Sequence, residues 1–258
     1  MENSRLVLRC NDICMDFGGV KAVDHFSMAV SPSTTTGLIG PNGAGKTTIF
    51  NVFSRIYRQT SGSLELDGVN VDNRGQVEVA RMGLSRTFQN IRLFSGLSVL
   101  DNVKVSLDHS AGYNMLDAVL HLPSRQREER RIGQRALDTL KLLKLDQYAQ
   151  SHATSLPYGL QRRVEIARAL VTEPKVLLLD EPAAGLNPEE VLQLVDFLKQ
   201  IRELYPQLAL LVIEHRMDLI MSLCDCLYVQ NFGRTIAQGK PAQVQCDPVV
   251  LAAYLGEE

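Results

Sequence analysis

The chain has 258 residues, of which 45% are hydrophobic, so it can form one large domain or two small ones around a substantial core. Its 27 basic and 29 acidic residues give a net charge of −2, which argues against a dedicated nucleic-acid binder, since such proteins carry a basic excess. No stretch approaches the roughly 20 apolar residues that cross a bilayer, and the first residues lack the apolar core of a secretory signal. We therefore expect a soluble, cytosolic protein.

The cysteine pattern narrows the class further. The five cysteines are an odd number, and no two of them form a C-x-x-C pair. Disulfide frameworks and zinc sites require cysteines in pairs or at characteristic spacings. The sequence therefore predicts free thiols.

The N-terminal residues predict an antiparallel β layer. Residues 6–9 and 24–30 have the pattern of strands, and Ser31-Pro32-Ser33 ends the second one. Phe17 lies between them, before a Gly-Gly turn. Its ring can either stack on the flat ring of a ligand or pack against its neighbours, and the local sequence favours packing.

The stretch G-P-N-G-A-G-K-T-T fits the phosphate-binding pattern G-x-x-x-x-G-K-[ST]. It consists of Gly40, Pro41, Asn42, Gly43, Ala44, Gly45, Lys46, Thr47 and Thr48. Its glycines let the backbone wrap phosphates with N–H groups pointing inward, Lys46 adds a full positive charge, and the Thr47 hydroxyl can ligate Mg²⁺. A strand over residues 34–39 precedes it and a helix over 48–55 follows it, which is the required order. The alternative is a glycine-rich turn that binds nothing.

The middle of the chain changes in character. Residues 62–67 predict a hairpin strand, 77–82 a short helix and 83–88 a strand that leads into Gln89. Residues 90–97 predict a loop with three apolar residues, Ile91, Leu93 and Phe94. Apolar residues on a loop are either tucked underneath or offered to a partner.

Residues 98–145 predict a helical insert, because strand signals are almost absent there. Ile132, Ala136, Leu140 and Leu143 follow helical spacing. The mixed charges over residues 125–131 favour a solvated helix face over a membrane-surface role. A further helix is expected to begin near Pro157 and to end at Val171, before Glu173-Pro174.

Two acidic residues follow a continuous apolar run over residues 176–179, which is typical of a central parallel strand. Ligands bind at the carboxyl ends of such strands, so Asp180 can hold Mg²⁺ and Glu181 can orient or deprotonate water. The alternative is that both acids belong to a turn that caps a helix. The next strand, residues 208–213, delivers Glu214-His215 to the same edge of the sheet, and His215 can contact a phosphate there.

Together these motifs resemble the nucleotide-binding subunits of ABC transporters over essentially the whole chain. The discriminating segment is L-P-Y-G-L-Q followed by R-R-V-E-I-A-R-A-L, which is similar to the ABC signature. It comprises Leu156, Pro157, Tyr158, Gly159, Leu160 and Gln161. The resemblance implies an α/β fold of the P-loop NTPase type, with a mainly parallel core sheet, an N-terminal antiparallel β layer and a helical subdomain.

The same resemblance implies residue roles. Phe17 would stack on adenine, Gln89 would sense the γ-phosphate and the metal, Glu181 would be the catalytic carboxylate, and His215 would contact the γ-phosphate beside Lys46. Thr47, Gln89 and Asp180 would hold Mg²⁺. Residues 184–187 would bridge two subunits. The signature would act on ATP bound to a partner subunit, and the loop with Phe94 would meet a permease.

The chain also departs from the usual signature. Pro157 stands where serine is usual, Tyr158 replaces a glycine and Leu160 a glutamine. These changes, with E-P-A-A-G-L-N-P-E-E and a tail ending A-Y-L-G, resemble the LivG-type subunits of branched-chain amino-acid importers. The loss of the serine hydroxyl weakens the expected action on the opposite site and favours a different chain as partner.

The resemblance finally implies an organisation and a setting. Residues 1–258 form one nucleotide-binding domain, with residues 1–89 and 172–258 as the catalytic core and 90–171 as the helical subdomain. The expected ligands are ATP and Mg²⁺. The expected partners are a second ATPase subunit, two permeases and, indirectly, a substrate-binding protein outside the cell, with no nucleic acid. The protein would lie on the cytoplasmic face of the cell membrane.

Two alternative functions stay open. One is a soluble ABC ATPase acting on nucleic acid or ribosomes. The other is a nucleotide-gated scaffold without hydrolysis, which an intact Glu181 disfavours.

Overall fold

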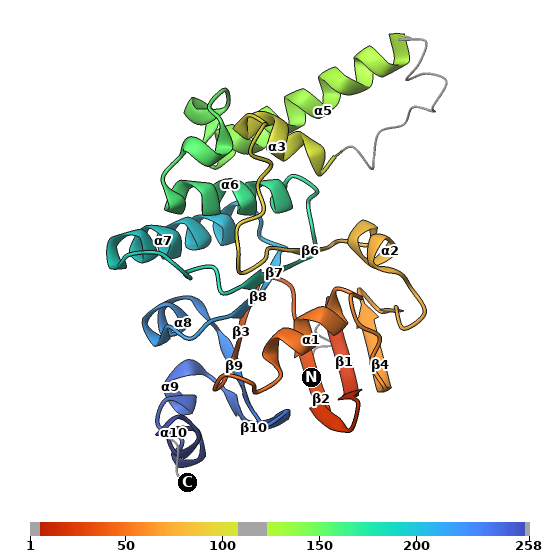
Figure 1. Ribbon diagram of the computed structural model, residues 1–258, viewed down its shortest axis with the longest axis vertical. Helices are drawn as coiled ribbons and strands as arrows, with labels where there is room; N and C mark the ends of the chain where they lie inside the picture. Colours follow the sequence, from red (N-terminus) through yellow and green to blue (C-terminus); the bar gives the residue numbers. More distant parts are fainter. Residues whose placement is uncertain (1–5, 108–122, 256–258) are drawn as a thin grey trace. The chain divides into compact units, whose positions relative to one another are not determined.

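The computed structural model describes residues 6–107 and 123–255. These fall into two compact units, one formed by residues 1–89 with 174–258 and the other by residues 90–173. The first unit is made of two sheets with surrounding helices, and the second is helical (Figure 1). The functional assignment of these units as core and signature-bearing insert stays a prediction.

The N-terminal sheet is antiparallel, with strand order β2-β1-β4-β5. Its strands are β1 (Leu8–Phe17), β2 (Val20–Val30), β4 (Ser61–Leu66) and β5 (Val69–Asn70). The alternation of residues 6–9 marks only the beginning of β1. Its pairing is irregular between Asn11 and Cys14, and Asp12 adopts a left-handed φ of 55°, so the bulge interrupts the period-2 pattern that would identify the rest of the strand.

The second sheet is mainly parallel, with strand order β10-β9-β3-β8-β7-β6. Its strands are β3 (Thr35–Ile39), β6 (Leu84–Arg86), β7 (Val176–Asp180), β8 (Ala209–Ile213), β9 (Cys226–Asn231) and β10 (Arg234–Gly239). Only β10 runs antiparallel to its neighbour. Strands β3, β7 and β8 are buried along their whole length, as the continuous apolar runs of β7 and β8 predict for those two.

The helices of the first unit are α1 (Lys46–Phe53), α2 (Gln76–Arg81), α7 (Pro188–Leu204), α8 (Met217–Leu223), α9 (Pro241–Val244) and α10 (Pro248–Leu255). Asn187 caps α7 by accepting from the Glu190 N–H, while the Glu190 carboxylate accepts from the Asn187 N–H. The sequence predicts neither α8 nor α9. Both are short, and α8 is held by tertiary burial of Leu219, Ile220 and Leu223 rather than by local signals.

A continuous apolar core joins the two sheets of the first unit. Phe26 of β2, Phe50 and Phe53 of α1, and Leu211 of β8 are all buried in it. A second cluster, including Ile39 and Val229, fastens α8, α9 and α10 to the parallel sheet. Helix α1, at the start of which Lys46 lies, is therefore anchored on both sheets.

The helical unit contains α3 (Val99–Val105), α5 (Pro123–Leu142), α6 (Tyr158–Leu170) and two 3₁₀ turns, Asp146–Tyr148 and Ala153–Ser155. The apolar positions with helical spacing are buried, as predicted: Ile132, Ala136, Leu140 and Leu143. Side chains 126, 127 and 129–131 are exposed and Glu128 is half-buried, so the described part of that run is an exposed charged face of α5; its solvated character stays a prediction. The Arg125 side chain lies outside the described residues.

Two further expectations concern the chain as a whole. All five cysteines are free, and burial raises the pKa of Cys10 and of Cys224 to about 12. Within residues 6–107 and 123–255, no helix is both long and apolar enough to cross a membrane.

Candidate functional site

The loop between β3 and α1 can be made only with glycine at two positions. Gly40 has φ 148°, and a Cβ built on it would lie 2.0 Å from the carbonyl oxygen of Gln230. Gly45 has φ 93°, and its Cβ would lie 2.3 Å from the carbonyl oxygen of Ala22. The loop is thus pressed against the backbones of β9 and β2, which explains in tertiary terms why these positions lack side chains.

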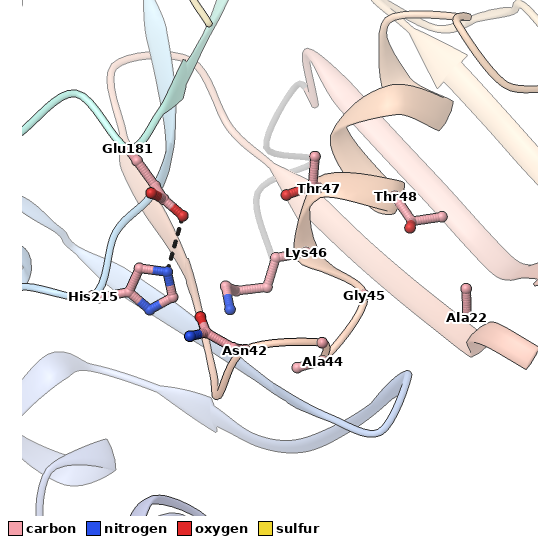
Figure 2. A pocket seen from close by; sticks show the side chains of 10 residues that line it. Ala22, Asn42, Ala44, Gly45, Lys46, Thr47, Thr48, Glu181 and His215 are labelled. Carbon is pink, nitrogen blue, oxygen red and sulfur yellow. Dashed lines mark hydrogen bonds and ion pairs between the residues drawn. The ribbon is translucent and has the colours of Figure 1, made fainter. Parts of the chain in front are cut away.

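This loop forms one wall of a cavity of about 210 Å³ (Figure 2). The cavity is lined by Ala22, Asn42, Gly43, Ala44, Gly45, Lys46, Thr47, Thr48, Glu181 and His215. The lining joins residues from β2, the loop, the start of α1 and the segments that follow β7 and β8. Gly40 and Pro41 are not among the lining residues, but both contact the Lys46 side chain.

Lys46 is the buried cation of this cavity, with 6% of the residue exposed. Its Nζ donates to the carbonyl oxygens of Gly40 and Pro41, both at 2.7 Å. Burial lowers the pKa of Lys46 below the ordinary lysine value, although the Glu181 and Asp180 carboxylates oppose this shift. The ammonium is therefore held inside the loop, where an anionic ligand would be its natural counter-charge.

Glu181 contacts residues that follow the two neighbouring strands of the sheet. Its Oε1 lies 2.9 Å from His215 Nε2, and its Oε2 accepts from Gln89 Nε2 at 2.6 Å. Gln89 follows β6, Glu181 follows β7 and His215 comes two residues after β8, and these strands are neighbours in the sheet. The structure thus brings Gln89 and His215 into contact with Glu181, and it places Glu181 and His215 in the cavity that Lys46 also lines. The roles of these residues stay predictions.

Glu214 was not predicted to have a role, but it shapes this site. It is 3% exposed and accepts from the backbone N–H of Ala183 at 2.7 Å and of His215 at 3.1 Å. Burial raises the pKa of Glu214, while these N–H groups act in the opposite direction. Its carboxylate ties the segment after Glu181 to the segment that carries His215. An acid directly after a buried strand was the available signal.

Asp180 has a partner that the sequence analysis also missed. Its Oδ2 forms an ion pair with Arg86 Nη2 at 2.7 Å, and both side chains are almost fully buried. Arg86 ends the short strand β6, in which Leu84 is buried and Ser85 half-buried, and a charged residue within a predicted strand was the available signal.

A divalent cation is implied by the phosphate-loop pattern, and the donor set at this site fits Mg²⁺. Thr47 offers a hydroxyl, Gln89 an amide oxygen and Asp180 a carboxylate, and Mg²⁺ prefers such oxygen ligands. The Gln89 amide nitrogen is the atom that contacts Glu181, and an amide ligates a cation through its oxygen.

Among the described residues that line the cavity, Phe17 is not included. It ends β1, is 41% exposed, and packs edge-to-face against Tyr57 with ring centroids 5.3 Å apart. This pair leaves an exposed aromatic surface, so both packing and stacking on a ligand remain compatible with its position.

The signature segment begins α6 in the helical unit. Leu156 is buried, and its carbonyl oxygen accepts from Gln161 Nε2 at 2.8 Å. Pro157 is the N-cap residue and supplies no capping side chain, while Tyr158 is 39% exposed. The backbone N–H groups at the start of α6 thus lack the hydroxyl that a serine at position 157 would provide.

The loop after Gln89 is fastened to the helices of its own unit. The Glu165 carboxylate accepts from the Arg92 N–H at 3.3 Å, and Arg168 donates to the Arg92 carbonyl oxygen. Asn102, fully buried, accepts from the Phe94 N–H and donates back to the Phe94 carbonyl oxygen. Phe94 itself is 51% exposed, while Ile91 and Leu93 are half-buried. The loop therefore offers an apolar side chain on a fixed backbone.

Comparisons with known proteins agree with one another. The family model described as "ABC transporter" matches residues 23–184, and that described as "Branched-chain amino acid ATP-binding cassette transporter" matches residues 234–258. The chain is 40% identical to the high-affinity branched-chain amino acid transport ATP-binding protein LivG of Escherichia coli K12, over 98% of this chain and 99% of that protein. The same identity and coverage hold for BraF of Pseudomonas aeruginosa.

Solved structures show the same likeness. A nucleotide-free ATP-binding cassette from an ABC transporter superposes with a TM-score of 0.83, at 32% identity, covering 98% of this chain and 100% of the other. An ATP-binding cassette in its ADP conformation superposes with a TM-score of 0.84, at 31% identity, covering 98% and 99%. The predicted α/β fold class is confirmed.

Proposed function

We propose that this chain, which belongs to the ABC transporter family of ATP-binding proteins, is the ATP-hydrolysing subunit of a branched-chain amino-acid importer. Membership of the family and ATPase activity rest on matches that span nearly the whole chain. The identity of the transported molecule is a more specific proposal than ATPase activity. It is supported by the match of residues 234–258 to the branched-chain amino-acid model and by the names of the relatives.

The observation that carries the proposal is that Glu181 and His215 line the cavity of the phosphate loop in contact with each other, while Gln89 donates a hydrogen bond to Glu181. Hydrolysis of a phosphoanhydride requires a group that orients water and positive groups that stabilise charge on the phosphate being transferred. Glu181 is placed for the first task. The Lys46 ammonium is placed for the second, and His215, which lines the same cavity, can add a hydrogen bond to the phosphate.

The mechanism follows from these positions. The inward N–H groups of the loop and the Lys46 ammonium bind the phosphates of ATP. The hydrogen bond from Gln89 and the contact with His215 hold the Glu181 carboxylate in a fixed orientation, from which it can accept a proton from water. Mg²⁺, held by Thr47, Gln89 and Asp180, would neutralise charge on the phosphate oxygens. Phe17 would supply a face for adenine.

The partners are part of the proposal. ATP would be closed between the phosphate loop of one subunit and the Leu156–Gln161 segment of a second ATPase subunit, with residues 184–187 at their interface. Such closure is a ligand-driven shift of population, since ATP contacts both halves only when they are closed. The exposed Phe94 would pass the motion to one of two permeases at the cytoplasmic membrane face. An extracytoplasmic substrate-binding protein would deliver the cargo.

Uptake in the protein's own host tests the cargo. The gene is deleted and restored with either the wild-type chain or Glu181→Gln, and uptake of radiolabelled leucine, isoleucine and valine is measured. We expect loss of uptake on deletion, restoration by the wild type and no restoration by the variant. Unchanged uptake of all three amino acids after deletion would refute the cargo but not the ATPase assignment.

The second class of function, a soluble ABC ATPase acting on nucleic acid or ribosomes, predicts a different distribution in the cell. The nearly balanced charge of the chain argues against it. Fractionation separates the two, because a transporter subunit sediments with membranes and a nucleic-acid ATPase with ribosomes or DNA.

A further inference from the structure

A buried arginine links the acidic strand to the helix of the phosphate loop. Arg86 Nη2 lies 2.7 Å from Asp180 Oδ2, and the two side chains are 6% and 7% exposed. Arg86 ends β6, and Asp180 ends the neighbouring parallel strand β7. The ion pair therefore joins the ends of two adjacent strands of the sheet. Glu181 directly follows Asp180, and Gln89 comes three residues after Arg86.

The other end of the guanidinium is fixed on α1. Arg86 Nη1 donates to Asn51 Oδ1 at 2.8 Å and to Ser54 Oγ at 2.9 Å, at the end of the helix that begins with Lys46. A planar guanidinium presents its donors in a fixed fork, so it can satisfy a carboxylate and a helix end at the same time. The Asp180 carboxylate is thereby held at a set position relative to the helix that carries Lys46 and Thr47.

Aromatic rings enclose the same guanidinium. Its central carbon lies 5.6 Å from the centroid of the Phe50 ring and 5.1 Å from that of the Phe88 ring. Phe88 directly precedes Gln89, so the Arg86 guanidinium packs on the side chain next to that amide. Contacts of this kind are attractive and exclude water, which strengthens the ion pair within the core.

Stability alone gives a weak reason for this arrangement. Burying two charges costs desolvation that their attraction barely repays, and apolar replacements of buried ion pairs are often neutral or stabilising. What the pair does supply is a single orientation of the Asp180 carboxylate. A buried cation that bonds to a carboxylate on one side and to a helix end on the other fixes where that carboxylate lies.

We propose that Arg86 is a positioning residue of the hydrolytic site, which orients the Asp180 carboxylate for Mg²⁺ and locks it to the phosphate-loop helix. This inference rests on the proposed function, because it requires Asp180 to serve nucleotide hydrolysis. It adds a residue that the phosphate-loop and acidic-strand motifs do not contain. Arg86 does not line the cavity of the phosphate loop; it acts through Asp180.

The test compares Arg86→Lys with Arg55→Lys. Arg55 is also buried near the end of α1, but it bonds to Gln59 and to the carbonyl oxygens of Asp72 and Arg74, away from the acids. Both variants lose a guanidinium fork from the same region of the unit, so both are expected to lower the melting temperature. Binding of a fluorescent, non-hydrolysable ATP analogue is then measured in EDTA and across a Mg²⁺ titration, alongside steady-state ATPase kinetics.

For Arg86→Lys we expect the Mg²⁺ concentration at half-maximal analogue binding to rise about 10- to 100-fold, as is typical when the group that orients a metal ligand is changed. Binding in EDTA should stay within about twofold of wild type, since the loop and Lys46 are unchanged. Arg55→Lys should leave the Mg²⁺ dependence unchanged. An equal Mg²⁺ dependence in both variants would overturn the proposal.

A milder variant covers the case in which Arg86→Lys does not fold. Asn51→Ala removes one anchor of Arg86 on α1 and leaves the ion pair with Asp180 in place. It should raise the Mg²⁺ requirement in the same direction by a smaller factor, and an unchanged requirement would again overturn the proposal. Absence of ATP binding and hydrolysis in the wild-type chain with its partners would instead contradict the proposed function itself.

Discussion

Glu181 illustrates how much chemistry depends on single atoms in this site. Each of its carboxylate oxygens is occupied by a different partner, His215 on one and Gln89 on the other. Glu181 also has a left-handed φ of 45°, which is uncommon for a residue other than glycine and is frequent at functional sites. These two features show that both the side chain and the backbone of Glu181 are held in a defined orientation.

Replacing this carboxylate should separate binding from turnover. We expect Glu181→Gln to bind ATP with nearly wild-type affinity and to lose about 100-fold or more in kcat, because an amide cannot accept a proton from water. Glu189→Gln, an exposed acid in the first turn of α7, is the matched control. Near-normal hydrolysis by Glu181→Gln would remove Glu181 from the proposed role.

The burial of Lys46 predicts the pH dependence of nucleotide binding. Its pKa is lowered in the empty site, and bound phosphates would raise it again, because they favour the ammonium. The contribution of Lys46 to affinity is then complete below the pKa of the empty site. It falls as the pH rises from that pKa toward that of the bound state.

Calorimetric titration with an ATP analogue at increasing pH measures this effect. Lys46→Ala should bind more weakly at neutral pH and should lose the part of the alkaline decline that Lys46 causes. The same affinity in Lys46→Ala and wild type would contradict the assignment of the phosphate loop, and the same pH slope would contradict the role of the ammonium.

Among the elements, the phosphate loop depends on its neighbours as much as on its own sequence. Gly40 lies against the backbone of β9 and Gly45 against that of β2, so the loop conformation is set where the two sheets of the unit meet. Gly43, in contrast, has φ 80°, and a Cβ added to it would lie in open space. The pattern G-x-x-x-x-G-K therefore includes glycines that are required for different reasons.

Alanine substitution should distinguish these reasons. Gly43→Ala adds only the strain of a left-handed residue, about 1–2 kcal/mol in the free energy of unfolding. Gly45→Ala adds the same strain plus a clash with the Ala22 carbonyl oxygen, so it should destabilise more and should displace the loop from β2. Denaturant unfolding and ATP-analogue binding measure both. Equal unfolding free energies for the two variants would contradict the packing described for Gly45.

At the scale of the whole molecule, the signature segment bears on which partner subunit completes the ATP site. The signature segment begins α6 with an exposed proline and no capping side chain, so it offers fewer donors to an opposite nucleotide than a serine-bearing signature would. A weakened signature is tolerated more readily when two different ATPases share the work. We therefore propose that the partner is a different chain.

ATP hydrolysis as a function of protein concentration tests the partner. The purified chain should bind ATP but hydrolyse it only slowly at every concentration, and Glu181→Gln supplies the background rate. A steep rise of specific activity with concentration would show that the chain forms its own closed dimer despite Pro157. In that case the preference for a different partner chain would be wrong.

The sequence by itself determined the elements that depend on local patterns. The phosphate loop, the apolar strand ending in Asp180-Glu181 and the capped helix after Asn187 all have short-range signals, because turn, strand and cap preferences act over a few residues. Only the tertiary structure decided which side chains meet. Gln89 and Asp180 find their partners Glu181 and Arg86 because β6, β7 and β8 are neighbours in one sheet, although these residues are more than 90 positions apart along the chain. Strand order and register carry no local signal, and for that reason the Arg86–Asp180 pair, the role of Glu214 and the contacts of Gly40 and Gly45 emerged only from the fold.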